Sequence, residues 1–112
     1  VAMVLVRVTE PEEVCRRFVT LDGIQPGVGL GRAIDIRRLH TSLGYEGHGF
    51  GSQLMVAVEN YARSLEISLI ITDATGPAKE FFDRHQYTGR LIEVDRKNGS
   101  TGNVFRCFKQ VM

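Results

Sequence analysis

Glycines crowd a short segment that leads directly into a helical pattern. Four of them stand within eight residues, at Gly44, Gly47, Gly49 and Gly51. Glycine costs the folded chain about 0.5–1 kcal/mol relative to alanine, so the run needs a compensating reason. One reason is a flexible turn. The other is an anion, most typically a phosphate, that lies on peptide N–H groups at the positive end of the following helix.

Two common phosphate-binding motifs do not fit this segment. A P-loop needs Gly-Lys-Ser or Gly-Lys-Thr at the helix start, and here Ser52 follows Gly51 without a lysine. The dinucleotide fingerprint needs the spacing G-x-G-x-x-G, whereas Gly47, Gly49 and Gly51 give G-x-G-x-G. The residues therefore predict an anion site and leave the nucleotide open.

The strand expected just before the glycines, over residues 33–42, has a fault in its alternation. Ile34 and Ile36 point to one face, whereas Leu39 falls on the other parity. A one-residue β-bulge near Arg37–Arg38 would bring all three onto one face. Because bulges re-aim side chains beside active sites, this strand and the glycine segment together form the candidate site.

The remaining elements must hold that site in place. Apolar runs and periodicity predict strands over residues 1–8 and 67–74, an amphipathic helix over 52–65, and two closing strands joined by an Asn-Gly turn. Two further helices follow Thr9, which can cap, and Thr75 or Gly76, while residues 22–31 are rich in Gly and Pro and predict a loop. The expected fold is an α/β sheet of mixed strand direction in one domain, residues 1–112.

Composition excludes several classes of function. The 112 residues carry a net charge of +1, which gives no electrostatic case for binding nucleic acid or an anionic membrane. No apolar run is long enough to span a bilayer and no signal peptide is visible, so we expect a soluble, cytoplasmic protein. Cys15 and Cys107 match no metal spacing and are expected to be reduced thiols, with no bound metal.

The glycine segment resembles the loop of the GNAT superfamily of N-acetyltransferases, whose signature is Gln or Arg, two residues, Gly, any residue, then Gly or Ala. Here it reads Glu46-Gly47-His48-Gly49-Phe50-Gly51, followed by SQLMVAVENYAR. The later segment AKEFFDRHQY is similar to a second family helix, in the right order around ISLIITDA. The resemblance covers residues 33–90 well. It implies a mixed, splayed sheet flanked by helices, and acetyl-CoA as the co-substrate.

The resemblance also implies which residues bind acetyl-CoA. Backbone N–H groups from about Gly47 to Ser52 would hold the pyrophosphate, and the preceding strand would bind the pantetheine arm. A Cβ at Gly49 or Gly51 would then stand where a phosphate oxygen must approach. The residues so implied are Leu39, His40, Thr41, Glu46, Gly47, His48, Gly49, Phe50, Gly51, Ser52 and Phe82.

Three features depart from the family pattern. Glu46 places a carboxylate near the pyrophosphate where Gln or Arg is usual, which should weaken binding unless it turns away or His48 offsets it. Gln86 replaces a glycine and is expected to adopt a left-handed conformation. The segment before residue 33 is shortened relative to the family, so the acceptor-binding wall is expected to be missing, reshaped or completed by another chain, as in a homodimer.

Acetyl transfer to an amine needs a group that removes a proton, because an alkylamine is almost fully charged at neutral pH. By resemblance to the histone-acetyltransferase branch, Asp35 occupies the position of a strand-borne base, directly or through water. The alternative is that Asp35 faces solvent or pairs with Arg37. Phe82 stands where many members carry a tyrosine acid. Candidates to replace that acid are Tyr45, Tyr87, His40 and His48, and Tyr87 is expected to pack in the core.

The predicted function is N-acetyl transfer from acetyl-CoA to a primary amine of a small molecule or protein. The alternative is a non-catalytic module of the same fold that binds CoA or a partner protein. The departures at Glu46 and Phe82 and the shortened N-terminal region make that alternative reasonable. O-acetylation and hydrolysis lack a visible nucleophile constellation. The identity of the acceptor is left open.

Overall fold

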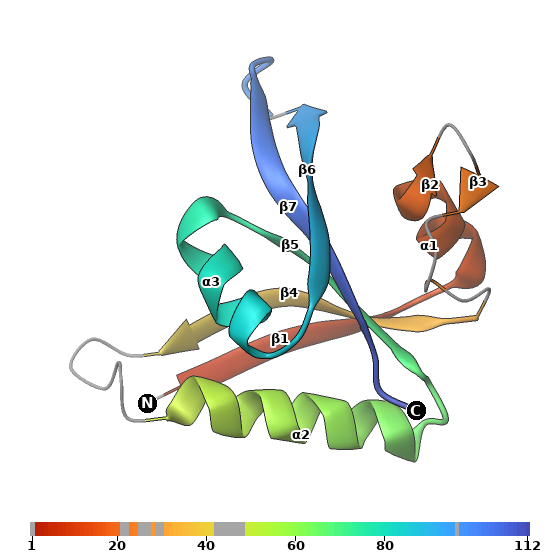
Figure 1. Ribbon diagram of the computed structural model, residues 1–112, viewed down its shortest axis with the longest axis vertical. Helices are drawn as coiled ribbons and strands as arrows, with labels where there is room; N and C mark the ends of the chain where they lie inside the picture. The colour runs from red at the N-terminus through yellow and green to blue at the C-terminus, as the bar shows by residue number, and fades with distance from the viewer. Residues whose placement is uncertain (1, 21–22, 25–27, 29–30, 42–48, 96) are drawn as a thin grey trace.

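The computed structural model describes residues 2–20, 23–24, 28, 31–41, 49–95 and 97–112. Figure 1 shows a twisted sheet with helices packed against it. In chain order the elements are β1 (Ala2–Thr9), α1 (Pro11–Phe18), β2 (Val19–Thr20), β3 (Gly23–Ile24), β4 (Ala33–Thr41), α2 (Phe50–Ser64), β5 (Leu69–Ala74), α3 (Gly76–Arg84), β6 (Thr88–Asp95) and β7 (Thr101–Gln110). The strands and helices expected from the sequence are all present.

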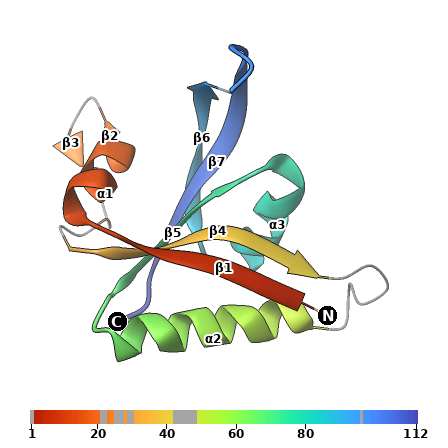
Figure 2. The same ribbon diagram turned by 180° about the vertical axis from the view of Figure 1, so that it is seen from behind.

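The main sheet has five strands in the order β1-β4-β5-β7-β6. β4 and β5 are parallel, and every other neighbouring pair is antiparallel, so the predicted mixed sheet is confirmed. The parallel pair is joined only from Ala33 and Leu69 to Ile36 and Thr72. Beyond that point β4 and β5 diverge, as both views show (Figures 1 and 2). The sheet is therefore splayed at its centre.

β4 contains the predicted bulge. Its register with β1 shifts so that Leu5 pairs with Arg38 and Val6 pairs with Ile36, which leaves Arg37 as the extra residue. The bulge restores the alternation, because Leu39 packs against the same apolar cluster as Ile34 and Ile36. One face of β4 is thus apolar at Ile34, Ile36 and Leu39, and Asp35 points to the other face.

The two faces of the sheet carry separate cores. α2 and α3 cover one face through a cluster that includes Met55, Val58 and Phe82. α1 covers the other face with Val14 and Phe18, both fully buried as their helical spacing predicts. The larger set on this second face also contains Val28, Ala33, Leu69, Ile71 and Phe108. Because β5 lies between the two cores, it is buried on both faces, as its continuous apolar sequence predicts.

Several local expectations need correction. Thr9 does not cap α1: the N-cap is Glu10, and the buried Thr9 hydroxyl has no partner in the described structure. Gly23–Ile24 pairs with Val19–Thr20, so part of the expected loop is a short hairpin. α2 begins at Phe50, two residues earlier than its periodicity predicts. The left-handed Gln86 is confirmed, with φ of 68°.

Two further expectations can be compared with the structure. Cys15 and Cys107 are both free thiols. Burial raises the pKa of the Cys107 thiol to about 11, so this side chain stays protonated at neutral pH. Among the helices described, none is long and apolar enough to cross a membrane.

Candidate active site

The site is built where β4 and β5 separate. Thr72 and Ile36 form their last register pair, and the Thr72 hydroxyl donates a hydrogen bond of 3.1 Å to the Ile36 carbonyl oxygen. β4 continues through Leu39, His40 and Thr41, which pair with β1 on one edge and have no register partner in β5 on the other. A strand edge with peptide groups directed into a cleft can bind an extended ligand arm.

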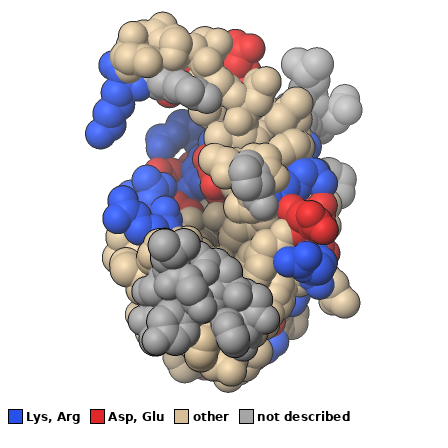
Figure 3. Space-filling view, turned by 90° about the vertical axis from the view of Figure 1, so that its left-hand side faces the viewer, with Lys and Arg blue, Asp and Glu red and all other residues tan. Residues whose placement is uncertain are grey.

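A polar pocket of about 160 Å³ opens at this divergence. It is lined by Arg17 of α1, by Asp35, Ile36 and Arg37 of β4, and by Asp73 of β5. In Figure 3, which looks at the molecule from the side toward which β4 runs, Lys and Arg atoms lie along one side of a hollow in which acidic atoms are visible. Four of the five lining side chains carry charge, so the pocket is suited to a polar ligand.

Asp35, the predicted base, is 1% exposed and lies in this pocket. Its Oδ2 accepts hydrogen bonds from Arg17 Nη1 at 2.7 Å and from Arg37 Nη1 at 3.0 Å. Arg7 Nη2 lies 3.5 Å from the same oxygen. The pairing with Arg37 proposed from the sequence is therefore present, together with two further arginines that the sequence did not indicate.

Asp73 is the second carboxylate of the pocket. Arg106 binds it in a bidentate manner, with both nitrogen–oxygen distances at 2.9 Å. Arg17 Nη2 lies 3.3 Å from Asp73 Oδ1, so one guanidinium joins the carboxylates of two diverging strands. Burial opposes ionisation of Asp73, but hydrogen bonds from Arg106 and the charge of Arg17 outweigh it and hold the pKa of Asp73 below its ordinary value.

Arg17 is fixed in its charged form at the centre of this arrangement. Its side chain is 11% exposed, and burial alone would lower its pKa. The charge and hydrogen bond of Asp35, reinforced by Asp73, reverse that effect and raise the pKa of Arg17. Arg106 Nη1 also donates to the Arg17 carbonyl oxygen at 3.1 Å, which ties the end of α1 to β7.

The start of α2 borders the opening on the other side of the sheet. Gly49 is the N-cap residue, with φ of 80°, and a Cβ there would meet no described atom within 4 Å. Gly51 is different, because its Cβ would lie 3.1 Å from the ring of Phe81. Gly49 is thus required by backbone conformation, and Gly51 allows close packing of α2 against α3. From the sequence we expected that both positions need glycine only because a phosphate oxygen must come close to the backbone.

Ser52 connects the same helix start to the end of α3. Ser52 Oγ and His85 Nε2 lie 3.1 Å apart, and the His85 ring packs against Phe81 with 4.6 Å between centroids. Burial, together with the positive charge of Lys109, lowers the pKa of His85. His85 is therefore part of the junction between α2 and α3.

Other residues implied for the site fall into two groups. Phe82 and Tyr87 are buried in the core at 4% and 5% exposure, as expected for Tyr87, with their rings 5.2 Å apart. Burial raises the pKa of Tyr87, and its hydroxyl has no partner among the residues that the structure describes. Tyr45, Glu46, Gly47 and His48 lie outside the described residues. The described ranges contain no group of three or more side chains placed to hold a metal ion.

Arg17 and Asp73 belong to the site but were not expected there from the sequence. One signal was available: an aspartate expected in a half-buried strand needs a cation or hydrogen-bond donors. No local pattern shows which arginine supplies them, since Arg17 is 18 residues from Asp35 in the chain. Asp73 is a charged residue inside the otherwise buried strand β5, which is a second signal that was not used.

Comparison with known proteins relies on structure. No protein-family model and no curated protein matches the sequence. Solved structures do match. Arabidopsis thaliana NAA60 in complex with acetyl-CoA has a TM-score of 0.76 at 15% identity, covering 97% of this chain and 64% of that one. Drosophila melanogaster polyamine N-acetyltransferase has a TM-score of 0.70 at 15% identity, covering 98% and 69%.

A third match is the GCN5-related N-acetyltransferase from Rhodopseudomonas palustris, with a TM-score of 0.60 at 26% identity. It covers 70% of this chain and 48% of that one. The chain has the GNAT fold. It spans about half of the length of the Rhodopseudomonas palustris protein and about two thirds of the length of NAA60. The mixed sheet flanked by helices, which the resemblance implied, matches the fold of these proteins.

Proposed function

We propose that the protein transfers an acetyl group from acetyl-CoA to a primary amine. The observation that carries this proposal is the separation of β4 from β5 after Ile36 and Thr72, beside the start of α2, in a GNAT fold. NAA60, which has this fold, is solved with acetyl-CoA. The Drosophila protein is described as forming N-acetylagmatine, which is the product of amine acetylation.

The residues present fit acetyl-CoA. Among the described residues, Leu39, His40 and Thr41 have no strand partner on the edge of β4 that faces β5, so their peptide groups can bind the pantetheine arm. The first turn of α2 has no acidic residue, and its N-cap is a glycine, so the N–H groups at Gly51 and Ser52 can face a pyrophosphate. Roles for Phe50, which borders this turn, and for Phe82, which is buried, stay predictions, as do those of Glu46, Gly47 and His48.

In the proposed reaction the amine nitrogen bonds to the acetyl carbon, the carbon–sulfur bond breaks, and CoA leaves as the thiolate. The nitrogen must also lose a proton. We propose that Asp35 takes it, directly or through water. Because Arg17 and Arg37 both bind Oδ2, the proton would reach the carboxylate at Oδ1. CoA thiolate is a fair leaving group and needs no acid from the protein.

A turnover assay tests this function. The intact protein is incubated with acetyl-CoA and a panel of amines, and release of free CoA thiol is followed together with the acetylated amine. The proposal expects amine-dependent thiol release. Acetyl-CoA that binds without turnover across the panel would instead support a non-catalytic CoA-binding module. Absence of both binding and turnover would contradict the proposal entirely.

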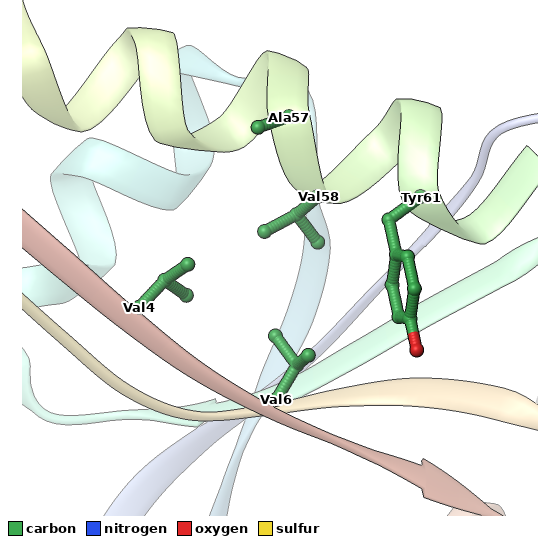
Figure 4. Close-up of a pocket in the computed structure, with 5 residues that line it drawn as sticks. All are labelled: Val4, Val6, Ala57, Val58 and Tyr61. Carbon is green, nitrogen blue, oxygen red and sulfur yellow. The ribbon is translucent and has the colours of Figure 1, made fainter.

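One observation favours the alternative of a protein-interaction module. An apolar pocket of about 250 Å³ lies between the edge strand β1 and α2. Figure 4 shows Val4 and Val6 of β1 facing Ala57, Val58 and Tyr61 of α2. Apart from the Tyr61 hydroxyl, these side chains offer no polar group, so the pocket suits an apolar contact and not the transfer chemistry. The turnover assay separates the two functions.

A further inference from the structure

We infer that the acceptor is a small amine that carries its own carboxylate, held in the polar pocket by Arg37. This inference rests on the proposed function and names its acceptor class. The pocket lies where the two parallel strands diverge, and its lining places two guanidinium groups beside two carboxylates. A ligand with one charge of each sign complements such a lining.

The balance of charge around the pocket favours an anionic group on the ligand. Ion pairs join its lining to neighbouring residues in one continuous network. The network contains five arginines and three carboxylates: Arg7, Arg16, Arg17, Arg37, Arg106, Glu13, Asp35 and Asp73. Three of these arginines share a single oxygen, Asp35 Oδ2. A ligand carboxylate would supply part of the missing negative charge.

Arg37 is the residue best placed to make that contact. It is the extra residue of the β4 bulge, its side chain is 49% exposed, and its Nη1 bonds Asp35 while it lines the pocket. A guanidinium presents five N–H groups in a rigid fork that matches a carboxylate. Arg37 can therefore hold Asp35 and an incoming carboxylate together.

The size of the pocket limits how much of the acceptor it can hold. A water molecule takes up about 30 Å³ of liquid, so 160 Å³ accommodates on the order of five such volumes. This is enough for an amine, a carboxylate and the carbon between them. The rest of the acceptor would extend outside the pocket. The pocket itself would recognise the aminocarboxylate group that is common to amino acids.

The test compares each amino acid with the amine left when its carboxylate is removed. Suitable pairs are arginine with agmatine, lysine with cadaverine, and phenylalanine with phenethylamine, measured as kcat/KM on the intact protein with acetyl-CoA. The inference expects the amino acid to be preferred by about ten- to hundredfold, the usual worth of hydrogen bonds to a charged group. Phosphoethanolamine against ethanolamine shows whether phosphate is accepted in place of carboxylate.

Two variants locate the preference. Arg37→Gln should lower kcat/KM for the amino acids by about ten- to hundredfold and remove the preference. Arg38→Gln is the matched control, because it removes the same charge from the next residue, which is exposed and does not line the pocket. It should leave the preference in place. An equal loss of kcat/KM for the amino acids in both variants would mean that only the overall positive charge matters. That result would overturn the proposed contact between Arg37 and the ligand carboxylate.

Failure of this inference is distinguishable from failure of the proposed function. Amines acetylated as well as, or better than, their amino acids by the wild-type protein would overturn the acceptor class and leave acetyl transfer intact. A phosphate-bearing amine preferred over every amino acid would also overturn it. Absence of turnover with every acceptor would overturn the proposed function, and the inference with it. The wild-type comparison needs no variant to fold.

Discussion

The hydroxyl of Thr72 donates a hydrogen bond to the carbonyl oxygen of Ile36 at the last point where β4 and β5 are joined. Both residues are buried, at 3% and 5% exposure. A side chain of β5 thus bonds to the backbone of β4 at the position where the backbone pairing of the two strands ends. The site depends on this junction, because the polar pocket and the open edge of β4 both begin there.

Replacing Thr72 by valine should weaken the junction. Valine keeps the β-branched shape but removes the hydroxyl, which leaves the buried Ile36 carbonyl without this donor. Leaving a buried acceptor unpaired costs about 1–3 kcal/mol, so the free energy of unfolding in urea should fall by that amount. Thr72→Ser keeps the hydroxyl and should lose less. Equal losses in the two variants would show that the hydrogen bond contributes little.

Replacing Arg17 by methionine should destabilise the protein strongly. Arg17 is 11% exposed and pairs with Asp35 and Asp73, and removal of one partner from a buried ion pair typically costs about 3–5 kcal/mol. Arg16→Met is the matched control, because Arg16 is 74% exposed and should change stability by no more than about 0.5 kcal/mol. Equal free energies of unfolding in urea for the two variants would contradict the claim that the ion pairs of Arg17 stabilise the fold.

The pH dependence of stability should reveal the lowered pKa of Asp73. Its pKa in the folded protein lies below the ordinary value of 3.8, so below about that pH the unfolded chain binds more protons than the folded chain. The contribution of Asp73 is therefore present above pH 3.8 and is lost as pH falls through the lowered pKa. Asp73→Asn should flatten the loss of stability in acid. An unchanged acid limb in unfolding experiments from pH 2 to 6 would argue against this coupling.

Gly49 and Gly99 provide a matched pair for testing the start of α2. Both have positive φ, 80° and 83°, and at both a Cβ would meet no described atom within 4 Å. Alanine at either position should cost about 1–2 kcal/mol of stability, because left-handed backbone is unfavourable for residues with a Cβ. Only Gly49→Ala should also weaken acetyl-CoA binding. Equal acetyl-CoA affinity in the two variants, measured by calorimetry, would remove the helix start from the site.

Asp35→Asn tests the proposed base. Loss of a general base typically lowers kcat by about 10²- to 10⁴-fold. Acetyl-CoA affinity should hardly change, because the proposed site for the phosphates is the start of α2 and not Asp35. Activity should recover as pH rises and more of the amine is neutral in solution. Stability must be measured in parallel, because Asp35 anchors three arginines. A folded variant with near wild-type kcat at neutral pH would make Asp35 a structural residue.

The sequence predicted those features that follow from local rules. The broken parity of Ile34, Ile36 and Leu39 predicted the bulge in β4. The resemblance to the GNAT pattern, which has a glycine at the position of Gln86, predicted the positive φ of that residue. In both cases a single physical rule, side-chain alternation or backbone sterics, acts within a few residues. The order of strands and helices followed from periodicity in the same way.

The remaining features depend on contacts between distant parts of the chain. Arg17 meets Asp35 and Asp73 only because α1 folds over the sheet where β4 and β5 diverge. Gly51 meets Phe81 only because α2 and α3 converge. No spacing in the sequence encodes these distances. Thr9 shows that a local rule can also mislead. Threonine is a good capping residue, but here Glu10 is the N-cap of α1 and the fold buries Thr9.

The most direct measurement of the central claim is a calorimetric titration of the intact protein with acetyl-CoA. We expect saturable binding with one acetyl-CoA per chain, weakened by Gly49→Ala and preserved in Gly99→Ala. We also expect that binding weakens as salt rises, because the contacts proposed at the start of α2 are electrostatic. Absence of saturable binding by the folded wild-type protein would contradict the claim that the divergence of β4 and β5 is an acetyl-CoA site.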